Sequence, residues 1–115
     1  MSQSPAVSIV MPVYNAMPFL PQTVQSIFAQ KFTDWELLAV DDCSRDGSWD
    51  YLQRIDDPRV RLMRNQRNSG VCFTINRAID AARGKWIARM DADDVILSDR
   101  LTKQVAALEA DPALD

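Results

Sequence analysis

Strand signals alternate with helix signals four times along this sequence, and no other feature constrains the fold as strongly. β-branched or buried apolar runs supply the strand signals, and apolar residues at helical spacing follow each run. The strands are expected at residues 6–13, 35–40, 59–64 and 85–90. Parallel neighbours in a sheet need crossover connections, and those crossovers are right-handed. The alternation therefore predicts an α/β domain with a mainly parallel sheet and helices on both faces.

The helix signals come with recognisable ends. Residues 19–30 carry a proline where a first helical turn accepts one, and residues 46–55 offer Ser48 as a cap. Ser98 is expected to cap a last helix, which Pro112 would close. The clearest helix has apolar residues at i, i+4, i+7, i+8 and i+11, which are Val71, Ile75, Ala78, Ile79 and Ala82.

Composition limits the function classes. The 115 residues, 47% hydrophobic and 25% charged, suit one globular domain, residues 1–115. A net charge of −3 argues against nucleic acid as a partner, and without histidine a metal site must use carboxylates. Cys43 and Cys72 are far apart and fit free thiols in a reducing compartment. Because there is neither a basic leader nor a long apolar run, the sequence predicts a cytoplasmic protein.

Polar residues follow every expected strand. In open α/β sheets, ligands bind beyond the carboxyl ends of the strands. The residues at those positions are Tyr14 and Asn15, Asp41 and Asp42, residues 68–70, and residues 91–94. We therefore expect a binding site where these four segments meet on one rim of the sheet.

The sequence DADD places Asp91, Asp93 and Asp94 directly after the fourth strand. In extended backbone, residues i and i+2 face the same way, so Asp91 and Asp93 can approach one ligand. Neighbouring carboxylates repel one another unless a cation lies among them, and hard oxygen ligands suit Mg²⁺ or Mn²⁺. Taken alone, such acids are more typical of a solvated loop or a helix cap. Their place at a strand end favours a metal site, and so short an acidic turn suffices for Mg²⁺ if the substrate is a diphosphate.

The ordered set of motifs resembles the inverting family 2 glycosyltransferases, which have the nucleotide-binding GT-A fold, a Rossmann-like α/β arrangement. The resemblance rests on VSIVMPVYN, LLAVDDCSRDGS, NSGVCFTINRAIDAARGKWIARMDADD and SDRLTKQ, in this order and spacing. It implies that Asp93 binds Mn²⁺ or Mg²⁺ between the two phosphates of the donor. It further implies nucleotide binding by Pro12, Val13, Tyr14, Asn15, Asp42, Asn68, Gly70, Asp91 and Ala92.

The resemblance also implies separate roles within the nucleotide site. The loop of Pro12, Tyr14 and Asn15 would line the base and the ribose, and Asp42 would hydrogen-bond the base. Asp91 would lie near the ribose or the diphosphate. The donor would be a nucleoside diphosphate sugar, with UDP favoured, and the sugar would pass with inversion to an unknown saccharide or lipid-linked acceptor.

Two features depart from the family pattern. Many members carry an arginine where this sequence has Ile75, before Asn76. The family's catalytic base lies in a later segment, so we expect it beyond Asp115. The chain is accordingly expected to be the donor-binding part of a longer enzyme, apparently truncated before the acceptor-binding half. The truncated face would favour self-association, and the enzyme would lie in the cytoplasm or peripherally at the inner membrane face.

Other interpretations stay open at the level of sequence. LLAVDD together with Asp91 could form the acidic Mg²⁺ pocket of a phospho-accepting receiver domain, although that acid pair normally follows the first strand. A non-catalytic nucleotide-binding module would differ only in lacking turnover. Asp41 could be a simple turn residue, and residues 68–70 a loop cap. The basic stretch from Arg59 to Arg67 predicts a solvated edge strand.

Overall fold

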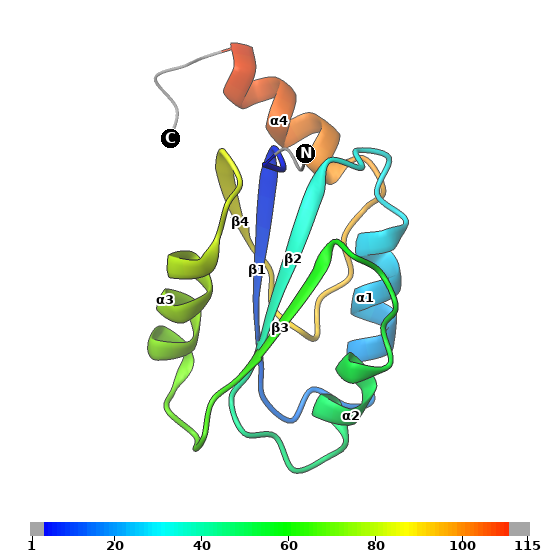
Figure 1. Cartoon of the computed structure of the whole chain (residues 1–115). Coiled ribbons are helices and arrows are strands. Elements are labelled where there is room, and N and C mark those ends of the chain that lie inside the picture. Colours follow the sequence, from blue (N-terminus) through cyan, green and yellow to red (C-terminus); the bar gives the residue numbers. More distant parts are fainter. Residues whose placement is uncertain (1–3, 111–115) are drawn as a thin grey trace.

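The computed structural model describes residues 4–110 and contains strands and helices in strict alternation (Figure 1). The strands are β1 (Val7–Val13), β2 (Trp35–Asp41), β3 (Val60–Arg64) and β4 (Trp86–Arg89). The helices are α1 (Leu20–Phe28), α2 (Ser48–Gln53), α3 (Val71–Ala81) and α4 (Arg100–Ala110). The predicted α/β alternation is confirmed, while the expected closure at Pro112 lies outside the described residues. No helix in the described part is long and apolar enough to cross a membrane.

The strands form one parallel sheet in the order β3-β2-β1-β4. The whole of β1 pairs with β2, and its first half pairs with β4 on the other side. The order therefore reverses after β3, because the chain returns across the sheet to place β4 beside β1. Such a reversal opens a crevice at the carboxyl ends of the two strands that flank it. The topology thus favours a site between the ends of β1 and β4.

Helices cover both faces of the sheet, as predicted (Figure 1). On one face, α1, α2 and α4 bury Leu20, Leu52 and Leu101 in the larger core. On the other face, α3 buries Ala78 against β1 and β2. Right-handed crossovers explain this division, since α3 makes the one connection that runs back across the sheet.

The face that α3 turns to the sheet differs from the apolar face expected from its sequence. Its buried residues are Thr74 and Ala78, whereas Val71 and Ile79 are exposed. Two reasons explain why Thr74 and Ala78 face the sheet. Small side chains let a helix approach a sheet closely, and the Thr74 hydroxyl finds a polar partner in Asn65 Nδ2 at 2.9 Å.

The start of α2 also differs from its prediction. The residue at the cap position is Gly47, in the left-handed conformation with φ 91°, and it has no side chain to bond to the helix amides. Ser48 lies one residue later and is fully buried. Its hydroxyl donates to Asp46 Oδ1 at 2.7 Å and accepts from the Ala16 amide at 3.1 Å. The predicted cap therefore joins two loops instead.

Glu36 is a buried carboxylate in β2 that the sequence did not single out. Its Oε2 accepts hydrogen bonds from Ser8 Oγ at 2.6 Å and from the Arg83 amide at 2.7 Å. Its Oε1 accepts from Arg61 Nη1 at 3.0 Å, and the same nitrogen donates to the Ala81 carbonyl at 2.8 Å. One carboxylate thus joins three strands to the end of α3.

The basic stretch around β3 lies at a sheet edge, as expected, but the expectation that it is simply solvated is wrong. Arg61 pairs with Glu36, and Arg64 Nε lies 3.3 Å from Oδ2 of the buried Asp41. Both arginine side chains remain partly exposed. The edge position explains this arrangement, because a long side chain there reaches an inner carboxylate while its charge keeps contact with water.

The surroundings of Glu36 set its protonation. Burial alone would raise its pKa, but the hydrogen bonds from Ser8, the Arg83 amide and Arg61 outweigh that effect and leave the pKa below its ordinary value of 4.5. A lowered folded-state pKa stabilises the fold above the unfolded-state pKa. That stabilisation is lost as the pH falls through the folded-state pKa.

We predict that Glu36→Gln lowers the free energy of unfolding at neutral pH by about 1–3 kcal/mol, because charged hydrogen bonds become neutral ones. The deficit should shrink as the pH falls below 4.5, where the unsubstituted chain loses the same contribution. Urea denaturation across this pH range measures both effects. Glu109→Gln, on the exposed side of α4, is the matched control. An equal deficit at all pH values would show that the carboxylate charge is not what stabilises the fold.

Candidate functional site

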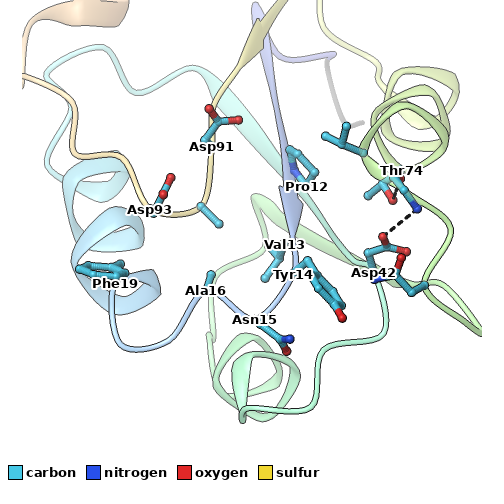
Figure 2. Close-up of a pocket in the computed structure, with 14 residues that line it drawn as sticks. Pro12, Val13, Tyr14, Asn15, Ala16, Phe19, Asp42, Thr74, Asp91 and Asp93 are labelled. Carbon is cyan, nitrogen blue, oxygen red and sulfur yellow. Dashed lines mark hydrogen bonds between the residues drawn. The ribbon is translucent and has the colours of Figure 1, made fainter.

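A cavity of about 500 Å³ lies at the carboxyl ends of β1, β2 and β4 (Figure 2). The ten residues to which the family resemblance assigns nucleotide or metal binding all line it: Pro12, Val13, Tyr14, Asn15, Asp42, Asn68, Gly70, Asp91, Ala92 and Asp93. Four further lining residues were not predicted: Ala16, Phe19, Val71 and Thr74. The structure therefore brings the candidate set together, while the contact of each residue with a nucleotide stays a prediction.

The cavity has two chemically different sides. Figure 2 shows Asp91 and Asp93 on one side and Asp42 on the other, with Pro12 between them. The Asp91 and Asp93 side chains are exposed, whereas Asp42 is buried. The Tyr14 ring, about half exposed, stands at the mouth. The site thus offers an acidic solvated end and a buried polar end.

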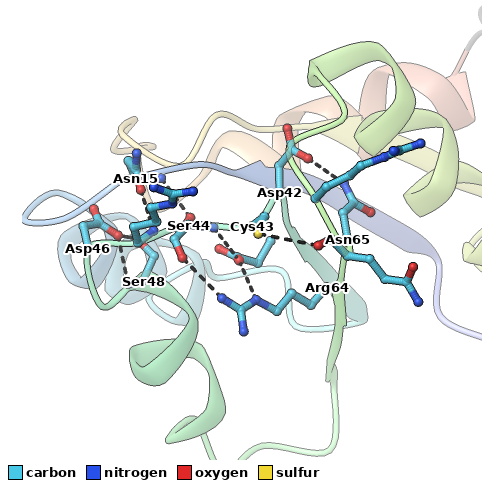
Figure 3. A network of polar contacts seen from close by, with 12 residues as sticks. Asn15, Asp42, Cys43, Ser44, Asp46, Ser48, Arg64 and Asn65 are labelled. Atoms are coloured by element: carbon cyan, nitrogen blue, oxygen red, sulfur yellow. Dashed lines mark hydrogen bonds and ion pairs between the residues drawn. The ribbon is translucent and has the colours of Figure 1, made fainter.

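The segment after β1 is held by the segment after β2. Asn15 adopts the left-handed conformation with φ 47°, which asparagine tolerates better than most residues. Its amide donates to Ser44 Oγ at 2.9 Å, and its Oδ1 accepts from the Arg45 amide at 2.9 Å. Asp46 Oδ2 accepts from the Met17 amide at 2.9 Å, and its Oδ1 accepts from Ser48 (Figure 3). Asn15 therefore has a structural role in addition to lining the cavity.

Asp42 binds three donors of the protein itself. Its Oδ1 accepts from Asn65 Nδ2 at 2.9 Å and from the Ser69 amide at 2.7 Å, and its Oδ2 accepts from the Gly70 amide at 3.0 Å. The turn at residues 68–70 is consequently folded around this carboxylate rather than being only a loop cap. Gly70 has φ 93°, a conformation that favours glycine, and its carbonyl accepts from the Thr74 hydroxyl at 2.7 Å.

Asp41 differs from Asp42 in direction and in partners. Its side chain is fully buried, and Oδ2 accepts from the Ser44 amide at 2.9 Å and lies 3.3 Å from Arg64 Nε. It does not line the cavity. The position left open by the sequence is therefore structural.

The acidic turn forms the exposed end of the cavity. One carboxylate oxygen from each of Asp91, Asp93 and Asp94 can lie within 4.8 Å of the others. Arg89 Nη2 lies 3.5 Å from Asp91 Oδ1, so one of these charges has a cation nearby. A set of convergent carboxylates open to water fits a hard divalent ion that keeps several of its waters. The residues present thus fit Mg²⁺ or Mn²⁺.

The acidic turn and the residues just after it are anchored by polar residues of α1, and by Gln30 two residues beyond its end, that sequence reasoning missed. The Thr23 hydroxyl donates to the Ala92 carbonyl at 2.8 Å, and Ser26 Oγ accepts from the Ile96 amide at 3.3 Å. Gln30 Nε2 donates to the Leu97 carbonyl at 2.6 Å. The sequence signal that could have identified these three residues is their spacing of i, i+3 and i+7, which places Thr23, Ser26 and Gln30 along one side of the helix and its end.

Comparison with known proteins agrees with this geometry. The sequence model of glycosyl transferase family 2 matches residues 8–114, which is most of the chain. The chain belongs to glycosyl transferase family 2. Its parallel sheet with helices on both faces is accordingly the GT-A fold. Membership in this family decides against the receiver-domain interpretation.

Curated proteins with glycosyltransferase names are similar to this chain over most of its length. One relative is the UDP-Glc:alpha-D-GlcNAc-diphosphoundecaprenol beta-1,3-glucosyltransferase WfgD of Escherichia coli, to which the chain is 33% identical over 102 residues. The alignment covers 89% of this chain and 40% of WfgD. The chain covers about two fifths of the length of this relative and of several others, and a smaller share of longer ones.

Solved structures give the same result. Staphylococcus aureus TarS in complex with UDP-GlcNAc superposes with a TM-score of 0.85 at 25% identity, over 90% of this chain and 31% of TarS. The mannosyltransferase PcManGT of Pyrobaculum calidifontis, in complex with GDP-Man and Mn²⁺, gives 0.86 at 27% identity, over 96% and 34%. Both resemblances concern the same α/β arrangement that builds the cavity.

We predict that Thr23→Val loosens the acidic turn, because the Ala92 carbonyl loses its hydroxyl donor while the side-chain volume is kept. The unfolding free energy should fall by about 1 kcal/mol. Amide exchange in the turn, read at Asp94 and Ile96, should quicken by up to about tenfold relative to amides of α3. Thr102→Val, exposed on α4, is the control. Unchanged exchange in the turn would contradict the anchoring role.

Proposed function

We propose that this chain binds the nucleoside diphosphate sugar donor of a family 2 glycosyltransferase, a UDP-sugar, through a divalent ion. The sugar would then pass to a saccharide or lipid-linked acceptor with inversion. The observation that carries the proposal is the cavity itself, where an acidic exposed end and a buried polar end lie on opposite sides of Pro12. Its volume of about 500 Å³ and its two chemically different ends suit a diphosphate joined to a nucleoside.

The buried end suits the nucleoside. A carboxylate only accepts hydrogen bonds, so Asp42 would accept from a ring N–H of the base. Pro12, Tyr14 and Asn15 would line the base and the ribose, and the exposed Tyr14 ring offers an apolar surface to a planar group. TarS is described in complex with UDP-GlcNAc, which supports a nucleotide of this kind.

The acidic end suits the diphosphate. Asp93 would hold the ion, and Asp91 would lie toward the ribose or the diphosphate. A divalent ion bound there would offset the negative charge that develops on the leaving nucleoside diphosphate. The Mn²⁺ described with PcManGT supports a divalent ion in general. Without such an ion, the acids and the diphosphate would repel each other.

The test is calorimetric titration of the chain with UDP and with GDP, in Mn²⁺ and in EDTA. We predict that UDP binds more tightly with Mn²⁺, and that Asp93→Ala lowers the Mn²⁺-dependent affinity by about tenfold or more. Affinity in EDTA should not fall, because without a bridging ion the Asp93 carboxylate only repels the diphosphate.

Asp80→Ala is the matched control, since Asp80 is an exposed acid on α3 outside the cavity. It should leave both affinities unchanged. Binding of UDP that is equal with and without the metal, or full Mn²⁺ dependence in Asp93→Ala, would overturn the assigned role of Asp93. A preference for GDP would retain the site but change the base.

A further inference from the structure

Asn65 is a buried amide at the end of β3 that lies behind Asp42 and outside the cavity lining. Its Nδ2 donates to Asp42 Oδ1 at 2.9 Å (Figure 3). The same nitrogen donates to Thr74 Oγ1, also at 2.9 Å. Its Oδ1 accepts from Arg77 Nη1 at 2.8 Å. The same arginine nitrogen donates to the Arg64 carbonyl at 3.0 Å. Arg77 thus reaches Asp42 through a single intervening amide.

This arrangement settles which way the Asn65 amide points. A guanidinium can only donate, so the Asn65 atom that faces Arg77 must be the oxygen. The nitrogen is then turned toward Asp42, where it can donate to a carboxylate that can only accept. The Thr74 hydroxyl, which donates to the Gly70 carbonyl, also accepts from this nitrogen and favours the same orientation. Arg77 therefore fixes the oxygen side of the amide, and loss of its donors would leave Asn65 held from the nitrogen side alone.

The Asp42 carboxylate has little freedom left once these bonds are made. It offers about four accepting positions, and Asn65 Nδ2, the Ser69 amide and the Gly70 amide occupy three of them. Two of the three lie on Oδ1, so the unoccupied position belongs to Oδ2. The direction of that position is set by the same bonds that hold the carboxylate plane.

We propose that Arg77 and Asn65 are positioning residues that aim the free accepting position of Asp42 Oδ2, and so give the site its preference for bases with a ring N–H. The inference rests on the proposed function, because it takes the ligand of the cavity to be a nucleoside diphosphate. Uracil presents N3–H to such an acceptor, whereas N3 of cytosine is itself an acceptor and is repelled. Preference for UDP over CDP is therefore the property that the pair controls.

The experiment compares UDP and CDP by calorimetry with Mn²⁺ present, because the two ligands share the diphosphate and the ribose. The unsubstituted chain should bind UDP about tenfold or more tightly than CDP. Arg77→Met, which keeps an apolar stem but has no donor, should lower the UDP-to-CDP affinity ratio by about threefold to tenfold. Arg77→Lys should restore part of the ratio, since its ammonium can still donate to Asn65 Oδ1.

Arg67→Met is the matched control, since Arg67 is an exposed arginine in the neighbouring loop and does not line the cavity. It should leave the ratio unchanged. A second measurement needs no substitution: the side-chain amide resonances of Asn65 should shift on addition of UDP and stay in place on addition of inorganic pyrophosphate.

Other outcomes would overturn either the positioning role of Arg77 and Asn65 or the proposed function. Equal losses of UDP and CDP affinity in Arg77→Met would show a merely structural role and overturn the inference, as would a wild-type chain that does not distinguish the two ligands. Asn65 resonances that respond equally to UDP and to pyrophosphate would also overturn it. Absence of metal-dependent UDP binding by the unsubstituted chain would instead overturn the proposed function, and the inference with it.

Discussion

The return of the chain from β3 to β4 is the constraint on which the site depends. Because β4 pairs with β1 and not with β3, the carboxyl ends of the two strands diverge into the loops that form the cavity. The connection through α3 also places the turn at residues 68–70 against the end of β2. A sheet with its strands in sequential order would bring the first and fourth loops to opposite edges, and the acidic turn could not face Asp42.

Three buried acids hold this geometry, and each is matched with donors from other elements. Glu36 joins β1, β2, β3 and the end of α3 at the amino-terminal ends of the strands, opposite the cavity. Asp41 joins β2 to Arg64 of β3, and Asp42 folds the turn before α3 around itself. A buried carboxylate without such partners would be costly. The polar framework therefore places the loops, and the apolar cores hold the layers.

Much of the fold and the list of cavity residues could be predicted, because both depend on local patterns. Strand signals followed by helix signals dictate parallel pairing, and parallel pairing brings every strand end to one edge. Partners distant in sequence could not be predicted. Glu36 is one acid in an apolar run, and its donors Ser8 and Arg83 are 28 and 47 residues away. Thr23 belongs to a polar stripe that the sequence does show, but nothing local indicates that its partner is a carbonyl 69 residues later.

The difference between the buried and the exposed acids bears directly on function. Asp42 has its protein partners already in place, so under the proposed function its contribution to binding would be directional and would need little rearrangement. Asp91, Asp93 and Asp94 lie close together in water, and among the described residues only Arg89 forms an ion pair with any of them. Their mutual repulsion is relieved when a cation binds, and a bound cation in turn attracts a diphosphate. One end of the cavity is therefore held in a fixed shape by its hydrogen bonds, and the other end concentrates negative charge. Under the proposed function, the two parts of a nucleoside diphosphate would be recognised by these two separate physical means.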